Sequence, residues 1–185
     1  MAFPTTTGAF PSPRLLCLPD PFDHRSPSLK TLAFSQYRSL TRSSHSLVVI
    51  AASATALVNL YHIALTVSRR KASGYTYPTP YAPLEAEKSS AAAYSFNCAQ
   101  RAHANFIENV PTFLATLLLS GLRFPLTSAA LGGVWIASRV VYARGYANSK
   151  HGDKGKGRLQ GATFWLPQMA LIGTGFVSGW QIFNS

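Results

Sequence analysis

Charged residues are scarce in this chain, and acidic residues are scarcer than basic ones. Only 12% of its 185 residues are Asp, Glu, Lys or Arg, whereas a typical soluble domain has about 25%. The 17 basic residues outnumber the 6 acidic residues, which gives a formal net charge of +11. With a hydrophobic share of 47%, this composition argues against an ordinary soluble enzyme. Because the hydrophobic residues lie in long runs, a wholly disordered chain is also excluded.

Cysteine is nearly absent, which removes two further classes of protein. Cys17 and Cys98 cannot form a disulfide framework, and neither has a partner at metal-ligand spacing. We therefore expect no metal site. Two cysteines also do not indicate whether the protein lies in an oxidising or a reducing compartment. The basic excess is typical of proteins that bind nucleic acid or an anionic membrane surface. The mean hydropathy of +0.09 favours the membrane, and the basic residues border apolar runs, so we do not expect a nucleic-acid partner.

The first 46 residues differ in composition from the rest. They contain six prolines, many Ser and Thr, five basic residues and two acidic ones, with no helical or strand period. We predict a disordered, basic, Pro/Ser-rich tail over 1–46. Its Arg and Ser content is weakly similar to that of a mitochondrial transit peptide, but the prolines, Asp20 and Asp23 oppose an amphipathic helix. Residues 47–185 are predicted to form one domain.

Long uncharged runs predict membrane helices in this domain. Residues 47–67 form a run of 21 residues without a charge, and 159–185 are again uncharged. Residues 110–122 and 124–138 are shorter than the roughly 20 residues needed to cross a bilayer. A helix long enough to cross the bilayer must therefore also include the polar residues of 101–108 in the first case and of 139–146 in the second. We predict an all-α, integral membrane four-helix bundle, with helices at about 47–67, 94–122, 125–147 and 159–182.

Two polar stripes fall within the middle helices. The loops after the first and third helices are rich in Lys and Arg, so both are expected on the cytosolic side. The polar residues of each middle helix then lie in the cytosolic leaflet. Those within 101–108 are spaced i, i+4, i+7 and those within 139–146 are spaced i, i+3, i+7, so each set forms one stripe along its helix. An ionised group facing lipid costs at least about 2.5 kcal/mol, so the stripes should face the protein interior. The stripes are Arg101, Asn105 and Glu108, and Arg139, Tyr142 and Tyr146, with Arg69, Arg70 and Arg158 at their mouth.

Simpler interpretations exist for each element taken alone. Arg101 and Glu108 would also serve as a pair that fixes helix packing. Tyr142 and Tyr146 fit an interfacial aromatic belt, and residues 69–71 fit a topology signal. The combination favours a ligand, because five arginines converge with Glu108 alone to neutralise them. The pattern predicts a cationic, tyrosine-lined recess for an anion.

Two motifs in these helices resemble those of a known family. Residues 96–105, Phe-Asn-Cys-Ala-Gln-Arg-Ala-His-Ala-Asn, followed by Glu108 and Pro111, resemble the second-helix signature of the MAPEG family. These are the membrane-associated proteins of eicosanoid and glutathione metabolism. Residues 139–146, Arg-Val-Val-Tyr-Ala-Arg-Gly-Tyr, resemble its third-helix motif. The resemblance covers roughly residues 45–183 and is closest to the microsomal glutathione S-transferases of the third type.

The resemblance implies a homotrimer that binds glutathione between subunits near the cytosolic face. Arginine suits the two carboxylates of glutathione because its guanidinium can pair with a carboxylate through two hydrogen bonds. Arg158 would stabilise the thiolate, with Tyr142 beside it. The connection 148–157 is longer than in leukotriene C4 synthase, from which the role of Arg158 is carried over, and Asn109 stands where several relatives have tyrosine. The implied glutathione ligands are Arg69, Arg70, Arg101, Asn105, Glu108, Arg139, Tyr142 and Tyr146.

The implied function is that of a glutathione transferase, with glutathione peroxidase or leukotriene C4 synthase-like activity as variants. Its second substrate would be an apolar electrophile or a lipid hydroperoxide from the bilayer. The implied location is the endoplasmic reticulum membrane, with the nuclear envelope and outer mitochondrial membrane left open. One alternative is a non-catalytic lipid-binding scaffold, resembling 5-lipoxygenase-activating protein of the same family. Another is a small anion carrier, but the other leaflet offers no polar path, being lined by Leu114, Leu117, Leu118, Leu131 and Val134.

Overall fold

The computed structural model describes residues 28–184, and the backbone alone for residues 37–43. The described part contains no strand, which confirms the predicted all-α class. The chain divides within its first helix into two compact units, and the helical bundle belongs to the second, residues 38–185. The elements are α1 (Leu29–Ser73), α2 (Leu84–Ser89), α3 (Ala91–Gly121), α4 (Pro125–Ala147), the 3-10 helix η1 (Lys156–Phe164) and α5 (Trp165–Phe183).

The first helix begins earlier than the sequence predicts. The composition predicts a disordered tail over 1–46, whereas α1 already starts at Leu29. All six prolines of this segment lie at or before Pro27, so no helix breaker follows that point. Ser28 caps the start, because its Oγ accepts a hydrogen bond from the backbone N–H of Thr31 at 3.2 Å. The remainder of the predicted tail, 1–27, lies outside the described residues.

The two middle helices agree closely with the predicted bounds. α3 starts at Ala91 rather than 94, where Ser90 provides the N-cap and accepts a hydrogen bond from the Ala93 N–H at 3.4 Å. α4 spans Pro125–Ala147, as predicted, with Pro125 in the first turn, where no intrahelical N–H is required. A short turn around Arg123 joins the two helices, so they pack antiparallel.

The last predicted helix, 159–182, is two elements in the structure. Its first part belongs to η1, which starts at Lys156, and α5 begins only at Trp165. Pro167 lies in the first turn of α5, a position that tolerates proline because its missing N–H has no helical partner. The 3-10 stretch packs against α4 through glycines, and this contact positions part of the candidate site.

Aromatic side chains fill the centre of the bundle. Phe113 of α3 stacks on Trp135 of α4, with ring centroids 3.8 Å apart, and both are fully buried. Phe164 of η1 meets Trp135 edge to face at 6.5 Å. α1 joins this core through His62, whose ring stacks on Phe106 at 4.6 Å. Contacts from α1, α3, α4 and η1 therefore converge on a single core.

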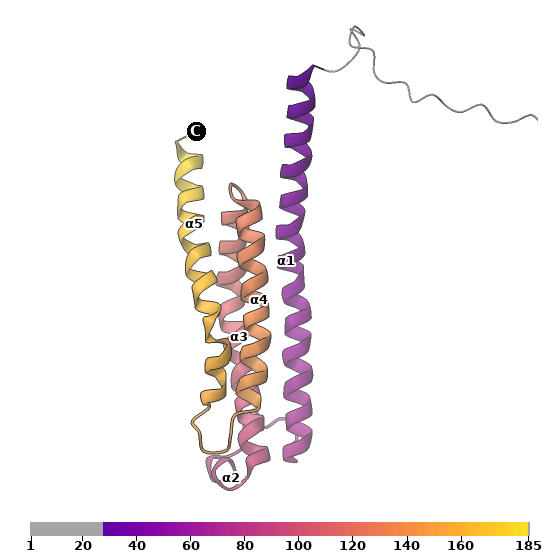
Figure 1. Cartoon of the computed structure of the whole chain (residues 1–185). Helices are drawn as coiled ribbons and strands as arrows, with labels where there is room; N and C mark the ends of the chain where they lie inside the picture. The colour runs from indigo at the N-terminus through magenta and orange to yellow at the C-terminus, as the bar shows by residue number, and fades with distance from the viewer. Residues whose placement is uncertain (1–27, 185) are drawn as a thin grey trace, which may run out of the picture. The chain divides into compact units, whose positions relative to one another are not determined.

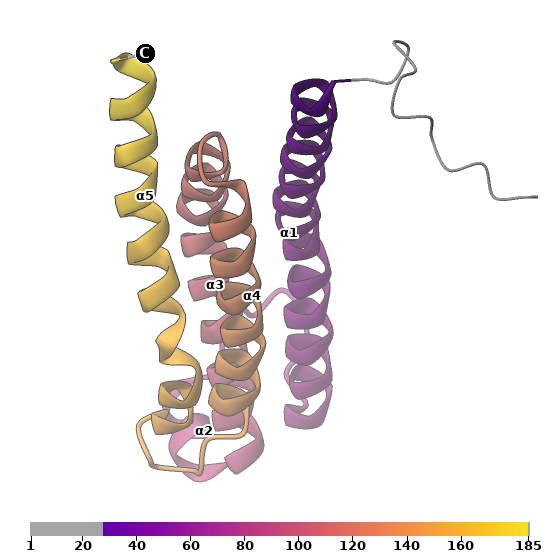
Figure 2. The ribbon, with the colours of Figure 1, turned by 45° about the horizontal axis from the view of Figure 1, so that its top comes forward.

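The basic loops meet at one end of the bundle. α3, α4 and α5 run side by side, and α2 lies at the same end as the connection between α4 and η1 (Figures 1 and 2). A hydrogen bond of 2.8 Å between His151 Nε2 and the Glu87 carbonyl oxygen ties this connection to α2. α3 begins and α4 ends at this end of the bundle, which is where we predicted that the recess opens.

Two of the described helical segments, Ser44–Ser73 and Pro125–Ala147, are long and apolar enough to cross a membrane. α3 is a continuous helix, but Arg101 and Glu108 interrupt its apolar sequence, as we expected. α5 is uncharged, and its exposed surface carries large apolar side chains such as Leu166, Phe176 and Trp180. This surface fits contact with lipid rather than water.

Candidate functional site

A cavity of about 450 Å³ opens at the α2 end of the bundle. It contains one residue of each predicted stripe, Arg101 of α3 and Tyr146 of α4, whereas the other four stripe residues do not line it. The connection between α4 and η1 closes one side through Lys154 and Gly155. The other lining residues are Tyr81, Ala82, Leu84, Glu87, Tyr94, Asn97 and Cys98.

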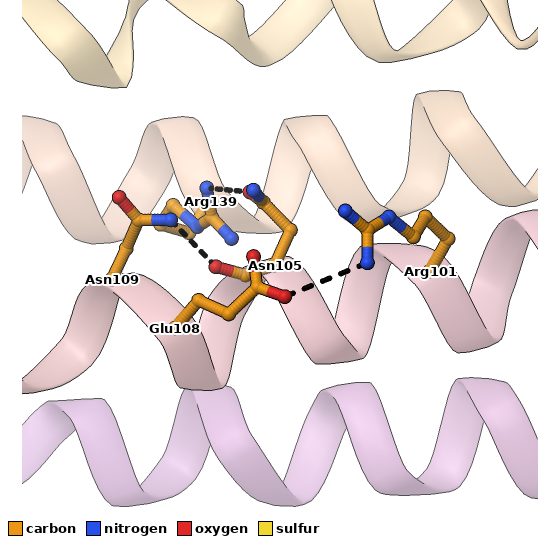
Figure 3. Close-up of polar contacts among 5 residues, drawn as sticks. All are labelled: Arg101, Asn105, Glu108, Asn109 and Arg139. Atoms are coloured by element: carbon orange, nitrogen blue, oxygen red, sulfur yellow. Dashed lines mark hydrogen bonds and ion pairs between the residues drawn. The ribbon is translucent and has the colours of Figure 1, made fainter.

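Arg101 and Glu108 form an ion pair on the exposed side of α3, whereas the sequence led us to expect both side chains to face the interior. The Arg101 Nη1 atom lies 3.5 Å from the Glu108 Oε1 atom, and the side chains are 55% and 54% exposed (Figure 3). Exposed pairs of this kind contribute little to stability, commonly below about 1 kcal/mol. Both groups are therefore available to a ligand at small cost to the fold.

Asn105 links this exposed pair to a buried arginine. Arg139 of α4 is fully buried, and its Nη1 donates a hydrogen bond of 3.0 Å to the Asn105 Oδ1 atom (Figure 3). The backbone carbonyl of Asn105 accepts a second bond from Asn109 Nδ2 at 2.7 Å. The sequence predicts Arg139 as a direct ligand contact, whereas the structure places it behind Asn105.

The Arg139 guanidinium lies among aromatic rings. Its Cζ atom is 4.3 Å from the ring centroid of Phe164 and 4.9 Å from that of Tyr142. Cation–π attraction of this kind is strongest when the cation is desolvated, and it offsets part of the cost of burying the charge. Within the described residues, Arg139 has no carboxylate partner, and its Nε and Nη2 atoms make no hydrogen bond. Arg139 is therefore held rigidly while remaining a net positive charge behind the site.

The two tyrosines of α4 complete the second stripe. Tyr142 and Tyr146 meet edge to face, with ring centroids 5.8 Å apart. Tyr142 is buried and Tyr146 partly so. Arg101 and Arg158 lie near enough to both phenol groups to interact electrostatically with them.

Glycine packing carries Arg158 to this cluster. η1 approaches α4 so closely that a Cβ atom on Gly157 would lie 2.1 Å from the Gly145 carbonyl oxygen. One on Gly161 would lie 2.2 Å from the Tyr142 backbone nitrogen. The Arg158 Cζ atom consequently lies 5.6 Å from the Tyr146 ring centroid. Arg158 does not itself line the cavity, but the longer connection before it still leaves its side chain beside Tyr146, which does.

The Arg158 side chain is also oriented by the connection itself. Its Nη1 atom donates to the carbonyl oxygens of Lys154 and Gly155 at 2.7 and 2.9 Å. Gly155 has a φ of 69°, a left-handed conformation that favours glycine. These two hydrogen bonds engage one guanidinium nitrogen and leave the other donors for a ligand.

Asp153 holds the connection against α3. Its Oδ1 atom accepts hydrogen bonds from the Tyr94 hydroxyl at 2.9 Å and the Gly155 N–H at 2.8 Å. Its Oδ2 atom accepts one from the Lys150 N–H at 3.0 Å. Desolvation favours the protonated carboxyl, but these bonds, with a weaker one from Lys156, outweigh it and hold the pKa of Asp153 below its ordinary value. Ionised Asp153 thus fixes the wall of the cavity.

Arg69 and Arg70 do not join the cluster within one chain. Arg70 is buried, with its Cζ atom 4.3 Å from the Tyr77 ring and 4.5 Å from the Phe96 ring, and its Nη1 donates to the Thr79 carbonyl at 2.6 Å. Arg69 donates to the side-chain oxygen of Asn148. Arg70 therefore fixes the loop after α1, and Arg69 joins α1 to the end of α4.

The sequence interpretation missed several residues that line the cavity, among them Tyr94, Cys98 and Lys154. Tyr94 and Cys98 precede the predicted Arg101 at helical spacing, i, i+4 and i+7, so a shared face could have been indicated. Lys154 has no such signal, because it enters the cavity only through the folded conformation of its loop.

A comparison with protein-family models identifies the matching family. The model described as the MAPEG family matches residues 48–177. The chain belongs to the MAPEG family. The match covers most of the chain, from α1 to α5, and includes both polar stripes. The family includes glutathione transferases and related enzymes.

This MAPEG chain is an all-α membrane protein, as its sequence predicts. Its two membrane-capable segments, Ser44–Ser73 and Pro125–Ala147, both lie wholly or largely within the matched range. The similarity to the microsomal glutathione S-transferases of the third type rests on the motif in residues 96–103 and remains a resemblance.

Proposed function

We propose that this MAPEG protein is a membrane-bound glutathione transferase that also reduces lipid hydroperoxides. The observation that carries the proposal is the cavity that Arg101 shares with Tyr146, with the Arg158 Cζ atom 5.6 Å from the Tyr146 ring and Tyr142 packed against the same ring. These residues come from three different elements, and Glu108 is the one acidic side chain in the two stripes. An anionic ligand with a single ammonium group would balance this arrangement, and glutathione has two carboxylates and one ammonium.

Each group of the site has a role in binding glutathione. Arg101 pairs with a carboxylate, and Glu108 accepts from the ammonium of the γ-glutamyl group. The Asn105 oxygen is occupied by Arg139, so its amide nitrogen donates to a carboxylate or carbonyl of the peptide. The Tyr142 and Tyr146 hydroxyls supply further donors. Arg139 acts through Asn105 and through its positive charge.

Arg158 activates the sulfur. A thiol with an ordinary pKa of about 8.5 is mostly protonated at neutral pH, and a neighbouring cation lowers that value. The proton leaves to solvent, and the thiolate attacks the electrophilic carbon of an apolar substrate to form a thioether; either a leaving group departs with its bonding electrons, or a carbon–carbon double bond opens and takes up a proton. With a hydroperoxide, the thiolate attacks the distal oxygen, the O–O bond breaks, and the released alkoxide takes up a proton from solvent to give an alcohol. A second glutathione then converts the resulting sulfenic acid to glutathione disulfide and water.

We propose a homotrimer in the endoplasmic reticulum membrane, with glutathione bound between neighbouring subunits. The exposure of Arg101 and Glu108, both about half accessible, supports a site that a second subunit completes. Arg69 donates to Asn148 of its own chain, so a role of Arg69 in binding would concern the neighbouring subunit's glutathione, whereas buried Arg70 would only support the loop after α1. The two basic loops would face the cytosol.

A stopped-flow experiment tests the proposed thiolate chemistry. Detergent-purified protein is mixed with glutathione while the ultraviolet absorbance of the thiolate is recorded. We expect a signal in the wild type that the Arg101→Ala/Arg158→Ala variant loses. Arg123→Ala is the matched control, because Arg123 lies in the turn between α3 and α4, and it should retain the signal.

The same preparations separate an enzyme from a scaffold. Equilibrium dialysis reports glutathione binding independently of thiolate formation. Binding without a thiolate signal would contradict thiol activation, and absence of both would favour a lipid-binding scaffold of this family.

A further inference from the structure

A second cavity lies on a different face of α4. Its volume is about 600 Å³, and we call it the basic pocket. Its basic side chains are Arg144 of α4, Lys150 of the following connection and Lys156 of η1. Asn148, Asp153 and Gln160 also line the pocket with polar side chains.

The basic pocket is separate from the proposed glutathione site. An α-helix turns about 100° per residue, so Arg144 lies about 160° around α4 from Tyr142. Arg101, Glu108 and Tyr142 do not line this pocket, and Arg144 does not line the cavity beside Arg101. Occupation of one cavity therefore does not require the other.

The charge of the basic pocket is not balanced internally. Among the described residues, no carboxylate forms an ion pair with Arg144, Lys150 or Lys156. Asp153 lines the pocket, but its oxygens already accept hydrogen bonds from Tyr94 and from backbone N–H groups. Arg69 adds positive charge at the edge, because it donates to the side-chain oxygen of Asn148. A hollow with three unpaired cations is an energetically suitable place for a polyvalent anion.

The depth of the pocket in the membrane indicates which anion is available. The membrane-capable segment of α4 ends at Ala147, and the pocket begins there with Asn148 and Lys150. Residues just beyond a membrane span lie at the level of the lipid headgroups. Arg144 lies one turn earlier, from where a long basic side chain extends toward the interface.

We propose that the basic pocket binds the phosphate of an anionic phospholipid headgroup. Arg144 supplies a planar guanidinium that matches a phosphate oxygen pair, while Lys150 and Lys156 supply two point charges. The ligand is a resident membrane lipid rather than a substrate. Because the pocket is shared between α4, its connection and η1, the bound lipid also joins the elements that position Arg158.

Native mass spectrometry of the full chain in detergent tests this site. The protein is titrated with phosphatidylserine, phosphatidylcholine or inorganic phosphate, and bound lipid is counted. Each basic residue near an anionic lipid contributes about fivefold to binding, so Lys150→Gln/Lys156→Gln should weaken phosphatidylserine binding about thirtyfold. Arg144→Gln should weaken it at least about fivefold by the same reasoning. Glutathione binding by equilibrium dialysis should not change, which keeps this test independent of the proposed catalytic function.

A charge-matched variant provides the control. Lys71→Gln/Lys88→Gln also removes two exposed lysines, from α1 and α2, outside the pocket. Equal loss of binding in both double variants would show diffuse surface attraction and overturn the proposal. Equal binding of phosphatidylserine and phosphatidylcholine would overturn it as well. If inorganic phosphate binds alone and displaces the lipid, the pocket serves a soluble phosphate and the lipid assignment is wrong.

Discussion

The side-chain oxygen of Asn105 accepts a hydrogen bond from Arg139 Nη1 at 3.0 Å. An arginine can only donate, so this contact fixes the amide with its oxygen toward Arg139 of α4 and leaves its nitrogen as a donor for another group. Arg139 is fully buried and Asn105 partly exposed, so the cation orders a group that the ligand can reach. Asn105 and Arg139 are both implied as ligand contacts by the family resemblance; under the proposed function, Asn105 would contact the ligand and Arg139 would orient Asn105.

Asn105→Asp should separate donor from acceptor at this position. An aspartate still accepts from Arg139, so the fold should be retained, but it cannot donate to glutathione and it repels a carboxylate. We expect glutathione affinity to fall at least about tenfold, the effect of losing one hydrogen bond to a charged group. Equilibrium dialysis measures the affinity, and thermal unfolding in detergent checks the fold. Unchanged affinity would show that Asn105 does not contact the peptide.

A double-mutant cycle tests whether Arg139 acts through Asn105. Arg139→Met removes the donor without leaving a buried charge, and Asn105→Ala removes the acceptor. If the arginine works by orienting the amide, the two losses of glutathione affinity should be non-additive by about 1–2 kcal/mol. Additive losses would mean that Arg139 influences the ligand by its charge alone.

Periodic features of the fold were accessible from sequence. The uncharged runs predicted the helices, and the helical spacing predicted which residues share a face of α3 and of α4, because both depend on local geometry. Arg101 and Tyr146 were predicted to share a recess, and they line one cavity. The resemblance to the MAPEG family was confirmed by the family match.

Features that depend on tertiary contact were not accessible. Residues 156–164 form a 3-10 helix because Gly157 and Gly161 lie against the α4 backbone, which no local pattern reveals. Arg70 was interpreted as a ligand, yet Tyr77 and Phe96 enclose it, because the loop after α1 folds back over α3. Lys154 likewise enters the cavity only through a loop with a left-handed backbone.

Arg158→Ala should lower turnover more than glutathione affinity. In the proposed mechanism the cation stabilises the thiolate, so its loss should raise the pKa of the bound thiol toward about 8.5. The rate at neutral pH then falls and recovers as the pH rises, whereas Arg158→Lys should retain part of the neutral rate. A pH profile of turnover, with affinity from dialysis, tests this. Equal losses of turnover and affinity would assign Arg158 to binding only.

Gly161→Ala should destabilise the protein. The added Cβ would lie 2.2 Å from the Tyr142 nitrogen and 2.5 Å from the Ser138 carbonyl oxygen, and backbone atoms cannot move aside. Overpacking of this kind costs about 1–3 kcal/mol. Gly173→Ala in α5 is the control, because nothing lies within 4 Å of its Cβ position. Thermal unfolding in detergent compares the two, and equal melting temperatures would contradict the close approach of η1 to α4.

Ionised Asp153 makes the connection between α4 and η1 sensitive to acid. Desolvation opposes its ionisation, but hydrogen bonds from Tyr94 and from backbone N–H groups outweigh this and lower its pKa below the ordinary 3.8. A lowered folded pKa means that the stabilisation is complete above the unfolded value and is lost as the pH falls through the folded one. We therefore expect residues 149–157 to lose protection from hydrogen exchange below about pH 4. Asp153→Asn should weaken that protection at neutral pH and remove its acid dependence. If the variant matches the wild type at both pH values, after correction for intrinsic exchange, Asp153 does not hold the cavity wall.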